Sequence, residues 1–141
     1  MSLHARPSAP LQQQSQWPLL DRIDLHIEVP SQSAALLINA PAGESTAALK
    51  KRCHHARLLA TQRQGCSNQA LSGAALDKHA ALEQDALAYI TQVASHFGWS
   101  GRSSHRVLKI ARTIADLAQS ANIEKAHIAE AVQYRRPVAG H

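Results

Sequence analysis

The sequence predicts an all-α fold: a compact bundle of four main helices plus one short helix, preceded by a flexible N-terminal arm with an orphan strand. Apolar residues make up 45% of the 141 residues but aromatic residues only 4%, so alanine and leucine must supply much of the core. That composition favours helices over sheets. Apolar residues also recur at helical spacing in several segments, whereas only one segment alternates apolar and polar residues. A chain of this length has room for one modest domain.

The N-terminal part of the chain shows no helical pattern. Residues 1–17 are rich in proline, glutamine and serine without periodicity, and we expect a disordered tail or a segment added by cloning. Apolar and polar residues then alternate from Ile23 to Val29, which indicates a strand at about 23–29. No second strand is evident to pair with it. Its backbone amides would lack partners, so we expect this segment to be loosely held.

From residue 44 onward, helical patterns alternate with residues that start and stop helices. Ser45, Ser72, Ser100 and Asn122 are placed to cap helix starts, and glycine is placed to end two of the helices. The helices expected on these grounds cover residues 44–64, 72–79, 82–97, 100–119 and 122–134. In the first helix the positions that can face the core are Ala48, Cys53 or Ala56, and Leu59 or Ala60. Because the connections are short, a compact bundle over residues 44–136 is favoured, with 137–141 as a tail.

The helix expected at 100–119 has two opposed faces. Its apolar residues, from Val107 to Leu117, recur at helical spacing. Its cations lie on another side, with no acid among them until Asp116. These cations are Arg102, Arg106, Lys109 and Arg112. The positive charges in this row repel one another, so we expect the row to face an anion, with phosphate the obvious candidate. A solvated basic surface is the alternative.

The chain lacks the motifs of a self-sufficient catalyst. It has no phosphate-binding loop of the Gly-Lys-Ser/Thr kind, no acidic metal-binding pair after an apolar strand, and no supported Ser-His-Asp arrangement. We therefore expect no ATP hydrolysis and no tight ATP binding by this chain alone. Cys53 and Cys66 are expected to be free thiols, and with His54 and His55 they do not have the spacing of a zinc site. No metal site is predicted.

Three segments carry a resemblance to a known family. Gly101-Arg102, with Arg112 in Ala-Arg-Thr-Ile-Ala-Asp-Leu ten residues later, resembles the sensor-2 helix of AAA+ ATPases, most closely the ComM/YifB branch of the magnesium-chelatase-like proteins. Residues 18–30 look like the segment that ends the ATPase core in that family. Residues 123–135 are similar to its last helix. The resemblance implies that residues 18–43 are a remnant of the AAA+ core and a linker, that 44–136 are the helical lid, and that the chain is a fragment or the product of a truncated gene.

The resemblance also implies roles for particular arginines. Arg102 matches the sensor-2 position, which contacts nucleotide phosphate, and Arg22 matches the arginine finger, which acts only in the parent protein. Arg106 and Arg112 are further candidates for nucleotide contact, although Arg112 is also placed to pair with Asp116, four residues on. His105 and His127 are expected to pack or to cap helices.

For the parent protein the family implies a bacterial ATPase that uses ATP and Mg²⁺. The lid covers nucleotide bound to the AAA+ core of the same polypeptide, contacts neighbouring subunits of a ring, usually a hexamer, and couples hydrolysis to remodelling of a partner. In this branch that partner is DNA, in competence and recombination. The sequence holds no long apolar run and no apolar leader, so we expect no membrane contact and a cytoplasmic location.

Two alternatives from other classes stay open. The helices expected at 100–119 and 123–134, with the turn between them, could form a helix-turn-helix-like DNA-binding module. The second helix of such a module reads the groove, but here it carries Glu124 and Glu130, which argues against that role. The other alternative is a plain interaction domain whose basic surface serves only solubility.

Overall fold

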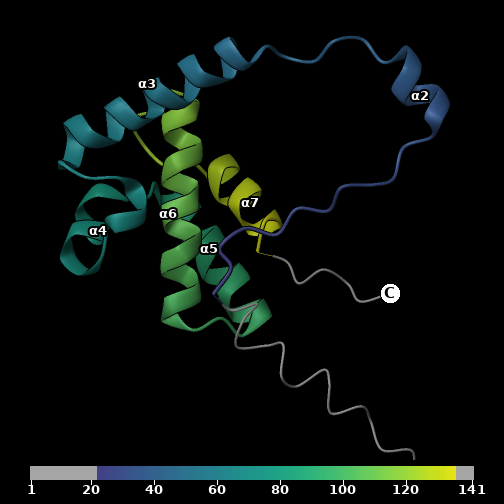
Figure 1. Ribbon diagram of the computed structural model, residues 1–141. Coiled ribbons are helices and arrows are strands. Elements are labelled where there is room, and N and C mark those ends of the chain that lie inside the picture. Colours follow the sequence, from purple (N-terminus) through teal and green to yellow (C-terminus); the bar gives the residue numbers. More distant parts are fainter. Residues whose placement is uncertain (1–21, 136–141) are drawn as a thin grey trace, which may run out of the picture.

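The computed structural model describes residues 22–135. The tails predicted at 1–17 and 137–141 lie outside this range. In chain order the elements are α2 (Ala34–Asn39), α3 (Thr46–Gln64), the 3₁₀ turn η1 (Asn68–Ala70), α4 (Gly73–His79), α5 (Gln84–Phe97), α6 (Gly101–Leu117) and α7 (Lys125–Gln133). The all-α bundle is confirmed, with α3, α5, α6 and α7 as its main helices and α4 as the short one (Figure 1).

Helix α6 is the central element of the bundle. Figure 1 shows α3 crossing one end of α6, with α5 and α7 beside it. The closest helix contacts join α6 to α7, α3 to α6 and α5 to α7. The buried core takes its largest apolar side chains from several elements. These are Leu71, Leu76, Ile90, Val107, Ile123 and Ile128. A parallel bridge between Leu82 and Ile123 ties the loop before α5 to the loop before α7.

The helix ends largely follow the local chemistry. Ser72 precedes α4 as predicted, but its side chain makes no capping hydrogen bond. The Ser100 side chain accepts a hydrogen bond from the Ser103 amide at the start of α6, and Gly65 and Gly98 end α3 and α5 with φ of 77° and 61°. The cap predicted at Asn122 is wrong. Helix α7 begins after Glu124, because the His127 ring accepts a hydrogen bond from the Glu124 amide while the Glu124 side chain accepts one from the His127 amide.

The strand predicted at 23–29 is wrong, since residues 22–33 contain no strand. With no partner strand in the described chain, this segment bonds to the bundle instead. The His26 amide donates to the Tyr134 carbonyl at 2.8 Å, and Arg135 donates to the Ile23 carbonyl at 2.9 Å. The alternating apolar residues are exposed, Val29 at 83%. The chain then runs out to α2, a short helix that the sequence did not predict and that lies away from the bundle in Figure 1.

Helix α3 packs through its second half only. Ala56 and Ala60 are buried as expected, but Ala48 and Cys53 are exposed, together with every residue from 44 to 55. In Figure 1 the first half of α3 extends past the end of α6. The periodicity of α3 therefore describes a helix correctly but overstates how much of it the bundle covers.

Candidate functional site: a cationic groove along α6

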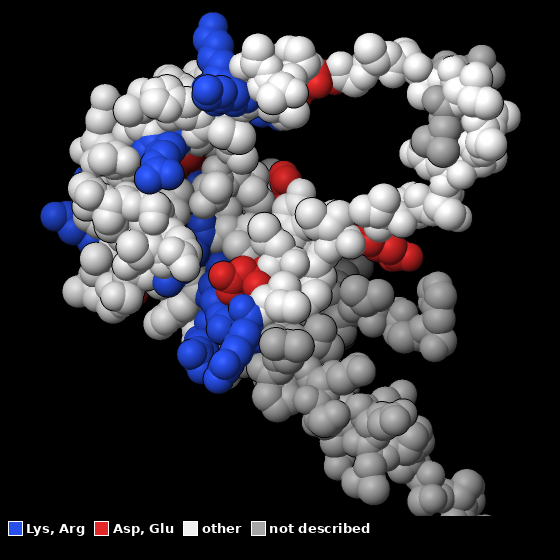
Figure 2. Space-filling model, viewed as in Figure 1, with Lys and Arg blue, Asp and Glu red and all other residues white. Residues whose placement is uncertain are grey.

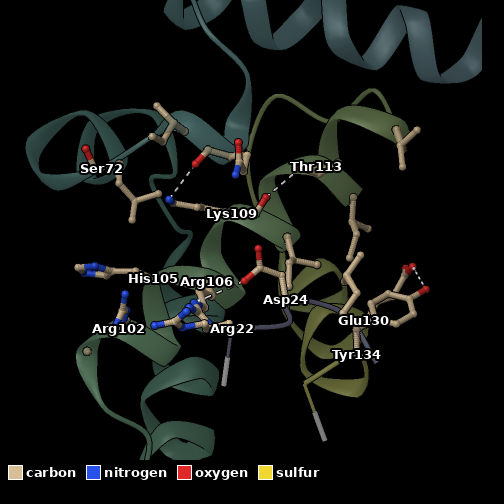
Figure 3. A pocket seen from close by; sticks show the side chains of 18 of the residues that line it. Arg22, Asp24, Ser72, Arg102, His105, Arg106, Lys109, Thr113, Glu130 and Tyr134 are labelled. Carbon is tan, nitrogen blue, oxygen red and sulfur yellow. Dashed lines mark hydrogen bonds and ion pairs between the residues drawn. The ribbon is translucent and has the colours of Figure 1, made fainter. Parts of the chain in front are cut away.

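An open groove of about 1180 Å³ runs along the exposed side of α6. Its other walls are the arm at residues 22–27, the segment from η1 to the first turn of α4, and the end of α7 (Figure 3). The groove exists because α6 buries one face in the core and leaves its basic face uncovered by another helix. Its basic side chains, one of them a histidine, come from two separate parts of the chain. They are Arg22, Arg102, His105, Arg106 and Lys109.

Arg102 stands in the first turn of α6 and is exposed. It makes no hydrogen bond or ion pair with any residue in the range 22–135. Figure 3 shows Arg22, Arg102 and Arg106 at the same end of the groove. Two arginines that the sequence singled out, 80 positions apart, are thus brought to one site. The first turn of a helix also presents free amides, which attract anions.

Arg106 is a partly buried cation of the groove. Its side chain is 16% exposed, and its Nε lies 3.4 Å from Oδ1 of Asp24, which is half exposed. One terminal nitrogen, Nη1, is buried and has no hydrogen-bond partner. A buried donor without a partner is uncommon in a folded protein. Arg106 Nη1 therefore has a hydrogen-bonding capacity that no residue in the range 22–135 uses.

The acids of the groove are fewer than its cations. Among the described residues, only Asp24 and Glu130 line it. Glu130 accepts a hydrogen bond from the Tyr134 hydroxyl at 3.0 Å, and that bond, with the charge of Glu130, raises the pKa of Tyr134. The Lys109 ammonium donates to the Gln69 carbonyl at 2.9 Å, which fixes it beside η1. The groove is therefore suited to an anion and, among residues 22–135, holds no carboxylate pair for a divalent cation.

Arg112 does not line the groove. Its guanidinium is buried and donates to the carbonyls of Ser120 and Ala121 at 2.7 and 2.8 Å, and it pairs with Asp116 at 2.9 Å. The pairing with Asp116 that the spacing predicts is confirmed. The structure does not bring Arg112 to Arg102, and the contacts indicate that Arg112 fixes the turn after α6.

Asp116 also joins α6 to α3. It accepts hydrogen bonds from Arg63 at 2.6 and 3.0 Å and from Asn68 at 2.8 Å. Burial alone would raise the pKa of Asp116, but the bonds from Arg63 and Asn68 and the charge of Arg112 outweigh burial and hold it below its usual value. Burial lowers the pKa of Arg112, and the nearby Asp116 charge partly opposes this. Sequence reasoning missed Arg63 and Asn68 because nothing local marks a partner about 50 positions away.

The cysteines and histidines that the sequence singled out have separate positions in the fold. Cys53 is exposed and Cys66 is half buried, both as free thiols. Within residues 22–135 no three histidine, cysteine or acidic side chains are grouped to hold a metal ion. No helix in that range is both long enough and apolar enough to cross a membrane. His127 caps α7, as predicted, and His105 lies on the groove.

Comparison with known proteins agrees with the resemblance. Residues 43–135 match the family described as magnesium chelatase, subunit ChlI C-terminal. The chain is 39% identical over 119 residues to "Uncharacterized protein YifB" of Salmonella typhimurium and 38% identical over 119 residues to the YifB of Escherichia coli. It is 34% identical over 122 residues to "Competence protein ComM" of Haemophilus influenzae. These alignments cover 84–86% of this chain but 24% of each relative, so the chain spans about a quarter of their length.

Proposed function

The chain belongs to the magnesium chelatase subunit ChlI C-terminal family, and on that premise we propose that it is the helical lid of a ComM/YifB-like AAA+ ATPase. The lid covers nucleotide held by the AAA+ core and couples ATP hydrolysis to remodelling of a partner, which we propose to be DNA. The observation that carries this proposal is Arg102. It stands exposed at the start of α6, on a cationic groove, without a partner among residues 22–135.

The chemistry of the groove supports a phosphate ligand. An arginine aimed at a transferring phosphoryl group stabilises charge that develops as the bond breaks. Arg102 would do this from the first turn of α6, where the helix amides add to the attraction. Arg106 adds a second positive charge at the same end of the groove. Arg22 lies on the same groove and, in a ring of subunits, would reach nucleotide as an arginine finger.

ATP would supply the phosphates, and Mg²⁺ would neutralise part of their charge. In this proposal the AAA+ core provides the metal ligands as well as the phosphate loop, because no group of three possible metal ligands occurs within residues 22–135. In this proposal the chain's own residues hold and sense the phosphates, and the intact parent forms a ring, most simply a hexamer, in the cytoplasm.

A chimera tests the proposal. Residues 18–135 would replace the equivalent segment of the Escherichia coli YifB, and ATP turnover would be compared for the parent chimera, Arg102→Ala and the matched control Lys78→Ala. Lys78 is an exposed cation on α4, away from the groove. We expect Arg102→Ala to lower kcat by about a hundredfold or more and Lys78→Ala to leave it unchanged. Equal turnover in all three proteins would remove Arg102 from the site.

The helix-turn-helix alternative is not favoured. Its reading helix would be α7, which buries Ile128, Ala131 and Val132 in the core and exposes the acids Glu124 and Glu130. If α6 serves nucleotide phosphates, this chain should show no sequence preference for duplex DNA. Nanomolar, sequence-selective binding at physiological salt would contradict the lid assignment.

A further inference from the structure

Helix α3 carries basic residues that do not line the α6 groove. It carries five cations in 19 residues, and no aspartate or glutamate occurs between Glu44 and Asp77. No acid therefore lies three or four positions from these cations within α3 to form a stabilising pair. The last cation, Arg63, is matched by the buried Asp116. Lys50, Lys51 and Arg52 lie in the half of α3 that the bundle leaves uncovered, and Arg57 is exposed just beyond it.

The exposed half of α3 keeps most of its charge unmatched. Arg52 pairs with Glu44 at 2.9 Å, and both side chains are almost half exposed. Lys50, Lys51 and Arg57 are exposed and form no ion pair with any residue of the described range. Figure 2 shows basic side chains standing out from the α3 end of the molecule, apart from those at the groove.

The unmatched cations share one side of the helix. Successive helical residues are turned by about 100° and rise by about 1.5 Å. Lys50, His54 and Arg57, at i, i+4 and i+7, therefore form a stripe about 10 Å long. Around the helix, Lys51 lies about 100° from Lys50 in one direction, and the buried Ala56 lies about 120° from Lys50 in the other. We call Lys50, Lys51, His54 and Arg57 the α3 strip.

We propose that the α3 strip binds the phosphate backbone of a nucleic acid, without reading its sequence. Duplex DNA carries one negative charge per about 1.7 Å of its axis, so a stripe of this length can meet several phosphates. The strip lies on α3 and not on the α6 groove, so this inference does not depend on the nucleotide role of Arg102.

Charge complementarity favours nucleic acid over an acidic protein. Stable protein interfaces surround a buried apolar centre, with charged residues depleted there. On α3 the large apolar side chains Leu49 and Leu58 are 39% and 43% exposed, but they are nine positions apart and cations separate them along the chain, so they form no continuous apolar centre. Protein–nucleic acid interfaces are instead polar and strongly positive. The α3 strip has the polar, positively charged composition of a protein–nucleic acid interface.

The test uses the whole 141-residue chain and a fluorescent DNA duplex of random sequence, about two helical turns long, with binding followed by anisotropy at several salt concentrations. Lys50→Gln/Lys51→Gln removes two charges from the strip. Lys78→Gln/Lys125→Gln removes two exposed charges from α4 and α7 and serves as the matched control. Circular dichroism and thermal melting of each variant confirm that it is folded.

We expect the strip variant to bind at least about tenfold more weakly at low salt, and the slope of log affinity against log salt to become shallower by about 2. The control should change neither quantity beyond a small, uniform loss. Equal losses in both variants would mean that only net charge matters and would overturn the proposal.

Two further measurements test whether the strip itself, and nucleic acid in particular, accounts for the binding. If Arg102→Gln/Lys109→Gln loses the binding while the strip variant keeps it, the groove and not α3 is the nucleic-acid surface, and the proposal fails. If poly-glutamate competes as well as DNA at equal charge concentration, the strip recognises acidic polymers in general, and its assignment to nucleic acid is wrong.

Discussion

Helices α3 and α6 carry similar charge but relate to the bundle in opposite ways. Helix α6 separates its residues, with Val107, Ala111 and Ala115 fully buried on one face and the groove cations on another. Helix α3 buries only Ala56 and Ala60, near its second half, and leaves residues 44–55 exposed. The comparison teaches that a basic helix becomes part of a built site only where an apolar face fixes it against the core.

The two helices also differ in how their cations are matched. On α6, Arg106 faces Asp24 and Arg112 pairs with Asp116 inside the protein. On α3, only Arg52 and Arg63 have acids nearby among the described residues. Arg106, Lys109 and Arg112 are thus positioned by the fold before any ligand arrives, whereas Arg102 and the side chains of the α3 strip keep the freedom of long surface side chains. Preorganised charge suits catalysis, and loosely held charge suits a partner of variable sequence.

The largest effect should come from Asp116, where the two helices meet. Asp116→Asn leaves Arg112 buried without a matching charge and removes the ion pair of Arg63. We expect the free energy of unfolding to fall by about 3–5 kcal/mol, measured by urea denaturation. Asp77→Asn, an exposed acid on α4, is the control and should change it by less than about 0.5 kcal/mol. A loss below about 1 kcal/mol for Asp116→Asn would show that the network does not hold α3 to α6.

A smaller loss of stability is expected when an apolar side chain of α6 is truncated, and almost none when one in the exposed half of α3 is truncated. Val107→Ala removes fully buried methyl groups from α6 and should cost about 2 kcal/mol. Leu49→Ala, in the exposed half of α3, should cost less than about 0.5 kcal/mol. Thermal melting of both variants is sufficient. Comparable losses would mean that the first half of α3 is covered in solution.

The helices of the bundle could be predicted from the sequence, but the conformation at 23–29 and the exposure of the first half of α3 could not. The five bundle helices and the glycine stops of α3 and α5 follow from periodicity and local caps, which act over a few residues. The strand at 23–29 was wrong because alternation reports the spacing of apolar residues and not the presence of a partner strand. The exposed half of α3 was missed for a similar reason, since Ala48 has the spacing of a core residue but nothing packs on it.

The candidate site was predicted in part. Arg22, Arg102 and Arg106 were named from the resemblance and from the cationic row, and they do line one groove. Arg112 belongs to the same row but turns into the protein, because the carbonyls of the turn after α6 and Asp116 surround it. Which cation of a row points inward depends on contacts from distant segments, and single-sequence patterns do not contain them.

The stability of the α3–α6 junction should also depend on pH. The pKa of Asp116 lies below its ordinary value of 3.8 in the folded protein, so its contribution to stability is present above that value and is lost as the pH falls through the folded pKa. We expect the melting temperature to decline below about pH 4 more steeply for the parent chain than for Asp116→Asn. Parallel declines for the two proteins would show that other carboxyl groups control acid unfolding.

The smallest change in stability, but an informative one, should come from Asp24→Asn. The Asp24–Arg106 contact is long, at 3.4 Å, and Asp24 is half exposed. Such a pair contributes little, so the free energy of unfolding should fall by less than about 0.5 kcal/mol.

The same substitution removes one of the two acids that line the described groove and leaves Arg106 without its counter-charge. Inorganic tripolyphosphate should therefore bind the variant more tightly than the parent chain in calorimetry, by a few-fold and less so as salt is raised. Asp77→Asn, which changes net charge equally but lies off the groove, should bind as the parent does. If both variants gain equally, the cations of α6 respond only to net charge, as loosely held surface cations would, and the contrast drawn with α3 is wrong.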